Sequence, residues 1–175
     1  MPEPTHDQRQ YMAMERALRA GRLNELPHEV TDQAEYPNVR DTYTWTPLII
    51  LAISWAPVPC VRELVAAGAD VNAQVDDGFP ALLNAVMSGR DDRVELVEAL
   101  VELGADLEAR GINGWTALHA AASTNDAAMV QLLVQLGADR AARTGIDDDA
   151  TPLQEAERAG AEDTARILRS ADAAR

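Results

Sequence analysis

Apolar residues recur along this chain in short runs that have the spacing of one helical face. In one such run the apolar and the acidic side chains take opposite faces: Val94, Val97, Leu100 and Val101 against Glu95, Glu98 and Glu102. The longest apolar run, from Pro47 to Ala56, spans 10 residues, whereas a membrane-spanning helix needs ~20. These patterns predict short amphipathic helices packed around a common core, and no membrane span.

The helical runs end at a Gly-Ala-Asp triplet that begins at Gly68, Gly104 and Gly137. Glycine suits such an end because the left-handed conformation that closes many helices brings it no Cβ clash. The separations of 36 and 33 residues indicate an internal repeat. We therefore expect an array of small stacked units.

A second marker runs in step with the first and predicts where helices begin. It reads Thr46-Pro47-Leu48, Pro80-Ala81-Leu82, Thr116-Ala117-Leu118 and Thr151-Pro152-Leu153. A threonine at the N-cap of a helix accepts a backbone hydrogen bond, and proline is tolerated in the first turn. We therefore expect Thr46 and Thr151 to cap helices in a chain of four units, each with a turn, a helix, a short connection and a second helix.

The two interlocked markers resemble the ankyrin repeat, whose Thr-Pro-Leu-His-x-Ala pattern and period of about 33 residues are matched at Thr116-Ala117-Leu118-His119. The resemblance implies an all-α solenoid of stacked helix-turn-helix units with short hairpin-like turns. It also implies that His119 is structural and hydrogen-bonds the turn backbone and the neighbouring threonine. Units with another residue at this position, Ile49, Leu83 and Gln154, are expected to lack those hydrogen bonds, worth ~1 kcal/mol each.

The resemblance divides this single ankyrin-repeat domain, 1–175, into parts. We expect an N-terminal capping unit at 7–39, repeats at 40–73, 74–109 and 110–143, a fourth repeat or C-terminal cap at 144–170, and a tail at 171–175. The capping unit should begin with a helix from Gln8 to Ala20, whose core face holds Tyr11, Met14, Ala17 and Leu18. A second short helix is expected from Leu23 to Leu26. At the other end, Ala161 to Arg169 predicts the last helix.

The residue before the helix-start marker is aromatic in three successive units, at Trp45, Phe79 and Trp115, and is Ala150 in the last. In ankyrin repeats this residue projects toward the concave face, which the turns and inner helices form, so the rings are expected to line up there. The alternative is a structural role, with each ring packed against a neighbouring turn. The expected partner-binding residues are Tyr43, Trp45, Ile53, Asp76, Asp77, Phe79, Met87, Ile112, Asn113, Trp115, Asp147 and Asp148.

The units also differ in the length of the connection between their two helices. The first unit has extra residues there from Trp55 to Pro59, and the second from Gly89 to Arg93. Insertions in a repeat array map to loops on one face, often the binding face. Each connection is therefore either a secondary binding loop or tolerated drift in length.

Charge narrows the class of partner. The chain has 29 acidic residues and 15 basic ones, all arginine, for a formal net charge of −14. Such a surface repels phosphate backbones, so we expect neither nucleic acid nor an anionic membrane as a partner. A basic protein would be attracted; alternatively, the acidity only keeps the protein in solution, and the aspartates serve as turn residues. The absence of lysine favours a GC-rich, bacterial source.

Catalytic chemistry is poorly represented in this sequence. The histidines His6, His28 and His119 are dispersed, and Cys60 has neither a cysteine partner nor an expected histidine neighbour. No metal or phosphate motif is present, so we expect no enzyme activity, cofactor or metal. A single cysteine fits a reducing compartment, and the N-terminus lacks the features of a secretory signal, which together predict a cytoplasmic location.

These observations predict a non-catalytic module that binds a protein partner through the concave face. An alternative is an inhibitor or immunity-like protein that neutralises a basic enzyme or toxin, and a distant one is an unrecognised enzyme. The sequence leaves the identity of the partner and the oligomeric state open.

Overall fold

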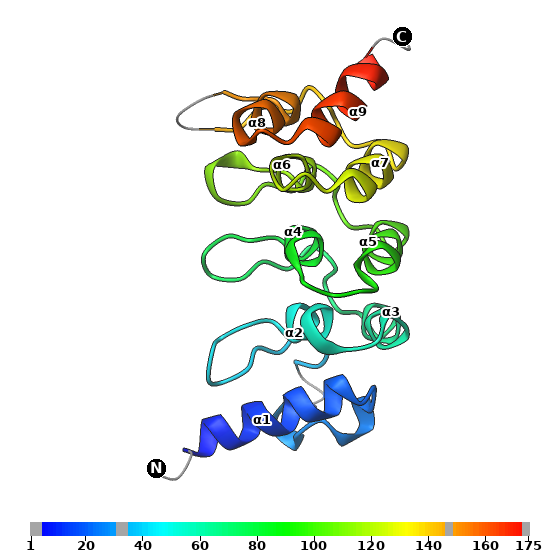
Figure 1. The fold of residues 1–175 in the computed structure, drawn as a ribbon. Helices are drawn as coiled ribbons and strands as arrows, with labels where there is room; N and C mark the ends of the chain where they lie inside the picture. The colour runs from blue at the N-terminus through cyan, green and yellow to red at the C-terminus, as the bar shows by residue number, and fades with distance from the viewer. Residues whose placement is uncertain (1–4, 31–34, 146–148, 173–175) are drawn as a thin grey trace.

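The computed structural model describes residues 5–30, 35–145 and 149–172, and within them helices stack in two columns (Figure 1). The inner column holds α2 (Leu48–Trp55), α4 (Ala81–Met87), α6 (Ala117–Ser123) and α8 (Pro152–Ala159). The outer column holds α3 (Val58–Ala66), α5 (Arg93–Glu102), α7 (Ala127–Gln135) and α9 (Glu162–Asp172). Helix α1 (His6–Arg19) lies across the N-terminal end. The expected all-α solenoid is confirmed.

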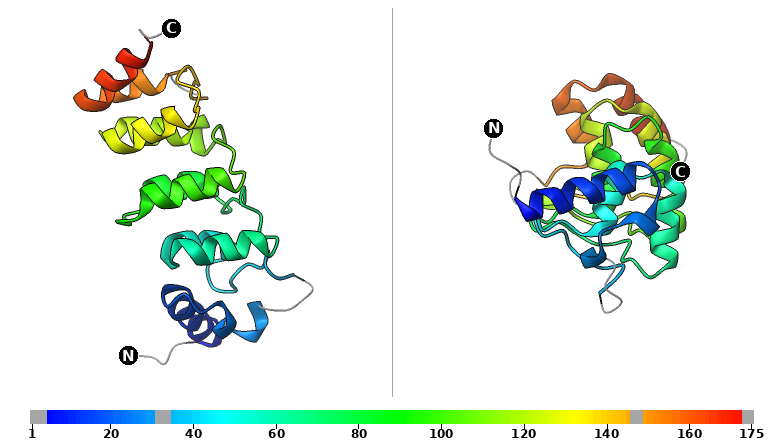
Figure 2. Two further views of the ribbon diagram at one scale, coloured as in Figure 1. Left: turned by 90° about the vertical axis from the view of Figure 1, so that its right-hand side faces the viewer. Right: turned by 90° about the horizontal axis from the view of Figure 1, so that it is seen from below.

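Four hairpin turns project from the inner column on one side and stack above one another (Figures 1 and 2). We call them hairpin 1 (residues 40–47), hairpin 2 (74–80), hairpin 3 (110–116) and hairpin 4 (143–145 and 149–151). Main-chain hydrogen bonds close each of them; in hairpin 2, for example, the Val75 N–H donates to the Phe79 carbonyl at 3.2 Å. Hairpin 3 contains a short 3₁₀ turn, η3 (Ile112–Gly114).

The Gly-Ala-Asp triplets end the first three outer helices, as expected. Gly68, Gly104 and Gly137 have φ of +105°, +99° and +97°, a backbone region in which other residues are strained. The aspartate then turns the chain toward the next hairpin: the carboxylate of Asp70 accepts the Asn72 N–H at 2.9 Å, and the other two triplets repeat this bond. The triplet therefore specifies both the end of the helix and the following turn through contacts within a few residues.

The triplets also connect neighbouring units through side chains of the unit before. Asn38 donates to the Gly68 carbonyl at 2.9 Å and accepts the Asp70 N–H at 2.8 Å. Asn72 makes the same two bonds to the next triplet. At the following step Glu108 accepts the Asp139 N–H at 2.7 Å, but a carboxylate has no N–H to donate to the glycine carbonyl. The third junction thus has half of this bridge.

The helix-start marker acts as expected at only some positions. Thr151 and Gln154 form a reciprocal capping box at the start of α8, so the expected loss of hydrogen bonds at Gln154 is wrong. Thr46 is not an N-cap, because α2 begins at Leu48 after Pro47. The buried carboxylate of Asp41 holds the Thr46 N–H at 2.8 Å instead, together with two other turn N–H groups.

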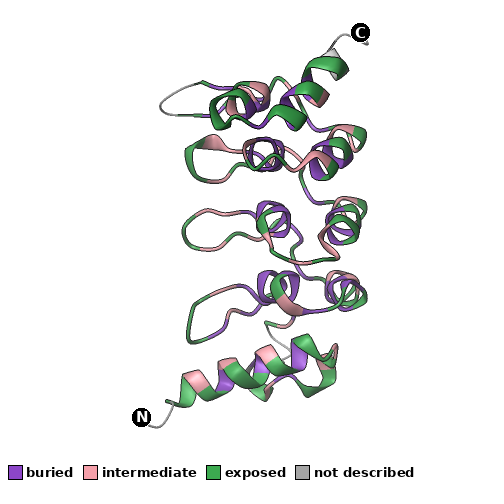
Figure 3. Ribbon diagram, viewed as in Figure 1, coloured by how far each residue is buried: buried purple, intermediate pink, exposed green. Residues whose placement is uncertain are grey.

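Alanine, leucine and valine side chains fill the space between layers, and exposed residues concentrate on the hairpin turns and outer surfaces (Figure 3). Helix α1 contributes Met14, Ala17 and Leu18 to this core. The expected second helix of the capping unit is wrong: two 3₁₀ turns, η1 (Leu23–Glu25) and η2 (His28–Val30), follow α1 instead. Pro27 explains the short length, since proline cannot extend a helix that precedes it. Nowhere in the described chain is a helix both long and apolar enough to span a bilayer.

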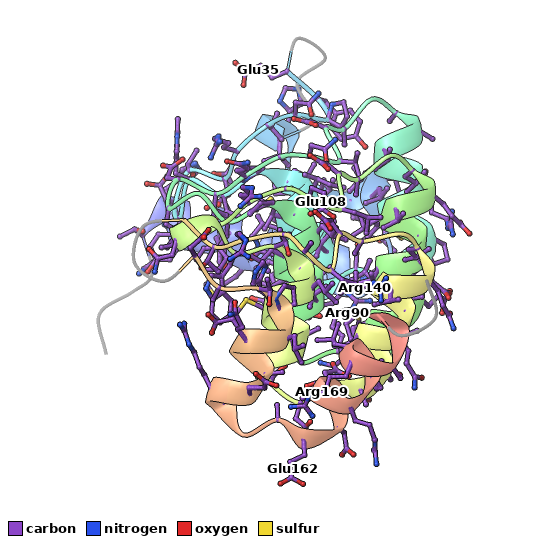
Figure 4. All side chains as sticks on the ribbon, turned by 90° about the horizontal axis from the view of Figure 1, so that it is seen from above. Glu35, Arg90, Glu108, Arg140, Glu162 and Arg169 are labelled. Carbon is purple, nitrogen blue, oxygen red and sulfur yellow. The ribbon has the colours of Figure 1, made fainter. Side chains whose placement is uncertain are left out.

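At the C-terminal end, α9 packs its apolar face inward and leaves charge outside. Leu168 is buried, whereas Glu162 is exposed and points away from the stack (Figure 4). Arg169 pairs with Glu157 of α8 at 2.5 Å. A charged outer face of this kind is typical of terminal repeats, which meet water on one side.

The connection between α4 and α5 packs against the preceding unit. The Arg90 guanidinium donates to the carbonyls of Ile53 and Ala56, at 3.1 and 2.7 Å, and to both oxygens of Asp92 at 2.7 Å. Pro57 explains the need for this donor: it has no N–H with which to continue the helical ladder to Ile53. The hydrogen bond to Arg90 holds the pKa of Asp92 below its usual value. The inserted residues therefore link two repeats.

Candidate partner-binding surface

The three hairpin aromatics differ in how far they are exposed. Trp45 lies at the tip of hairpin 1 and is 58% exposed. Phe79 and Trp115 are half-buried and pack against the core. The centroids of the Trp115 ring and the His119 imidazole are 6.4 Å apart. Two of the rings thus combine a structural contact with a solvent-facing edge. Their role in binding stays a prediction.

Two residues at equivalent positions of the inner helices have opposite surroundings. Met87, at the end of α4, is 57% exposed, whereas Ile53 of α2 is completely buried. Helix α1 packs against α2. Arg90 donates a hydrogen bond to the Ile53 carbonyl in the last turn of α2. Ile53 is therefore a core residue in this structure, and placing it on the binding surface is wrong.

The other hairpin residues expected in the site are exposed where the structure describes them. Asp76 pairs with Arg40 of hairpin 1 at 3.0 Å, and Asp77 accepts the Phe79 N–H at 3.4 Å. Ile112 and Asn113 are exposed on hairpin 3. The Asn113 carbonyl accepts the Gly145 N–H at 2.6 Å and so links hairpin 3 to hairpin 4. The remaining expected contacts, Asp147 and Asp148, lie outside the described residues.

An aromatic cluster at the N-terminal end joins one expected contact, Tyr43, to Tyr11 and Trp55, which were not expected in the site. Tyr11 of α1 contacts Tyr43 and Trp55, with ring centroids 5.5 and 5.4 Å apart, and Arg19 lies 5.5 Å from the Trp55 ring centre. Burial and the nearby Asp41 carboxylate raise the pKa of Tyr11. Sequence reasoning assigned Tyr11 to the core face of a capping helix and Trp55 to a loop. Only the way α1 crosses α2 brings them together.

A hollow of about 650 Å³ opens on the concave face between the first two repeats. It lies between the end of α1, the end of α2, hairpin 2 and α4, and its lining includes Arg19, Trp55, Asp77, Phe79, Met87 and Arg90. Its volume is in the range of 300–1,000 Å³ that is usual for ligand clefts. It joins the cluster at Trp55 to the expected contacts on hairpin 2 and α4.

The buried titratable groups serve the fold. The Nδ1 of His119 accepts the Thr116 N–H at 3.2 Å, and its Nε2 lies 3.0 Å from the Ala150 carbonyl, so both ring nitrogens have partners, as the resemblance implied. Burial lowers the pKa of this imidazole and raises that of the Cys60 thiol, which disfavours a thiolate nucleophile. Across the described residues, no three histidine, cysteine or acidic side chains gather into a metal-binding group.

Comparison with known proteins gives a family and several relatives. A family described as ankyrin repeats (3 copies) matches residues 14–111 and 82–174. Alpha-latroinsectotoxin-Lt1a of Latrodectus tredecimguttatus is 42% identical over 57% of this chain, and RelA-associated inhibitor of Mus musculus is 33% identical over 70%. Protein phosphatase 1 regulatory subunit 27 of Mus musculus is 43% identical over 41%. This chain covers 7%, 15% and 44% of their own lengths, respectively.

Proposed function

Because this chain belongs to the ankyrin-repeat family, whose repeats are protein-interaction modules, we propose that its concave face binds a protein partner without catalysis. The observation that carries this proposal is the hollow between the first two repeats, beside which the apolar side chain of Met87 stands 57% exposed. Exposed apolar side chains that rim a cleft are typical of protein-binding sites. The internal hydrogen bonds of His119 and the raised pKa of Cys60 support the absence of catalysis.

Affinity capture from the native host, followed by titration of the purified partner, tests this function. Met87→Ala and Trp45→Ala should each weaken binding about tenfold, since each truncation removes apolar area from the interface. Val94→Ala is the matched control because Val94 is 39% exposed on the outer helix α5. Equal affinity of all three variants and the wild type, with their folds intact by circular dichroism, would refute the proposal.

A second candidate is an inhibitor that neutralises a basic protein. It is supported by the net charge of −14 and by the exposed Asp76 and Asp77 of hairpin 2, and one relative is named an inhibitor. Salt should then slow association steeply, and Asp76→Asn with Asp77→Asn should weaken the complex. Indifference to both changes would leave only the general binding function. We place such an inhibitor in the cytoplasm, which fractionation of the host would test.

A further inference from the structure

The hollow between the first two repeats has an apolar wall. Trp55, Phe79 and Met87 line it, and they come from α2, hairpin 2 and α4. Arg19 lies over the Trp55 ring, 5.5 Å from its centre, so this ring is held in place from one side. Packing of an apolar side chain against such a wall would bury area that each free partner leaves in water.

Both arginines that line the hollow are paired with carboxylates, whereas Asp77 has no basic partner among the described residues. Arg90 is tied to Asp92 and to two carbonyls, and Arg19 pairs with Glu15 at 2.8 Å. Asp77 is exposed, and the described residues give its carboxylate the Phe79 N–H but no basic side chain. The lining therefore has one carboxylate that an incoming cation can reach, on a protein whose net charge is −14.

We propose that this hollow binds a partner segment in which an apolar side chain stands next to an arginine or lysine. The apolar side chain packs on Phe79, Met87 and Trp55, and the cation pairs with Asp77. The inference rests on the proposed function and adds the chemistry of the partner to it. An acidic segment is disfavoured because its carboxylates would meet Asp77 in the overall negative field of the protein.

A random peptide library displayed on phage and panned on the immobilised full chain tests this chemistry. Selected peptides should combine leucine, phenylalanine or another apolar residue with arginine or lysine. Synthetic copies should bind Met87→Ala about tenfold more weakly than the wild type, and Asp77→Asn about twofold to fivefold more weakly. Asparagine keeps an oxygen for the Phe79 N–H, so the turn should survive. Glu162→Gln, which removes one negative charge on the exposed end of α9, is the matched control.

A double-mutant cycle then measures how much the pair between Asp77 and the cation of the peptide contributes to affinity. A peptide whose arginine or lysine is replaced by glutamine should bind the wild type and Asp77→Asn equally well, because the pair no longer exists in either complex. If Asp77→Asn weakens both peptides alike, or if the selected peptides are acidic, the inferred chemistry is wrong while the concave binding face stands. If no peptide is selected, the inferred partner segment is contradicted, whereas the proposed function is still decided by the affinity capture. If binding of the captured partner is also indifferent to Met87→Ala, Asp77→Asn and Trp45→Ala, both the inference and the proposed function are contradicted.

Discussion

Replacing Arg90 with alanine should be the most informative stability change in this chain. The variant removes two charged hydrogen bonds to the carbonyls of Ile53 and Ala56, each worth about 1.5–3 kcal/mol. The Arg90 side chain is only 14% exposed, but its removal would let water reach these carbonyls, which returns part of the loss. The ion pair with the more exposed Asp92 adds at most about 1 kcal/mol. We expect Arg90→Ala to lower the free energy of unfolding by about 2–4 kcal/mol, and Tm by about 6–12 °C.

Chemical denaturation and thermal unfolding, followed by circular dichroism, measure this loss. Arg62→Ala is the control because Arg62 also links two repeats, through Glu102 at 2.6 Å, but these side chains are 43% and 62% exposed; it should cost less than about 1 kcal/mol. Arg90→Lys should fall between wild type and Arg90→Ala, since an ammonium cannot reproduce the planar fork. Equal costs for Arg90→Ala and Arg62→Ala would refute the assignment of the inserted residues to a structural link.

Three further predictions concern single positions. Glu108→Asn should raise the free energy of unfolding by about 0.5–1.5 kcal/mol, because asparagine can also donate to the Gly137 carbonyl. A loss of stability in urea titration would contradict the view that the third junction lacks one of the two inter-unit hydrogen bonds. Gly111→Ala should destabilise the protein by about 1–3 kcal/mol, because the Cβ of the new alanine would lie 2.6 Å from the Leu83 side chain. An unchanged Tm would contradict this prediction and show that hairpin 3 can shift to make room. Because the pKa of buried His119 is lowered on folding, only the unfolded chain binds its proton just below pH ~6.5, so stability should fall as the pH drops below that value. His119→Gln should flatten this slope between pH 5 and 7 in thermal melts, and an identical slope in the variant would exclude His119 as its source.

Much of the fold could be read from the sequence because the decisive contacts are local. The triplet at Gly68 ends a helix through its own φ and turns the chain through a carboxylate that bonds two residues ahead. The capping box at Thr151 likewise needs only Gln154, three residues away. The expectation was wrong at Thr46, where another residue of the same hairpin, Asp41, holds the turn through its carboxylate.

The candidate site was less predictable, since exposure depends on what covers a residue. Ile53 and Met87 occupy matching positions in their repeats, and the sequence treats them alike. Helix α1 covers the first inner helix, while the hollow leaves the second open. Trp55 was assigned to a loop and proved to line that hollow.

The sequence by itself determined the repeat, its phase and the ends of most helices, because glycine, aspartate and threonine act on backbone groups within a few residues. The tertiary structure decided which side chains remain available to a partner. It buried Ile53, turned the inserted Arg90 toward a carbonyl 37 residues upstream, and left Asp77 without a basic neighbour among the described residues. Burial and pairing of this kind depend on neighbours from other units, whose distances no local pattern specifies.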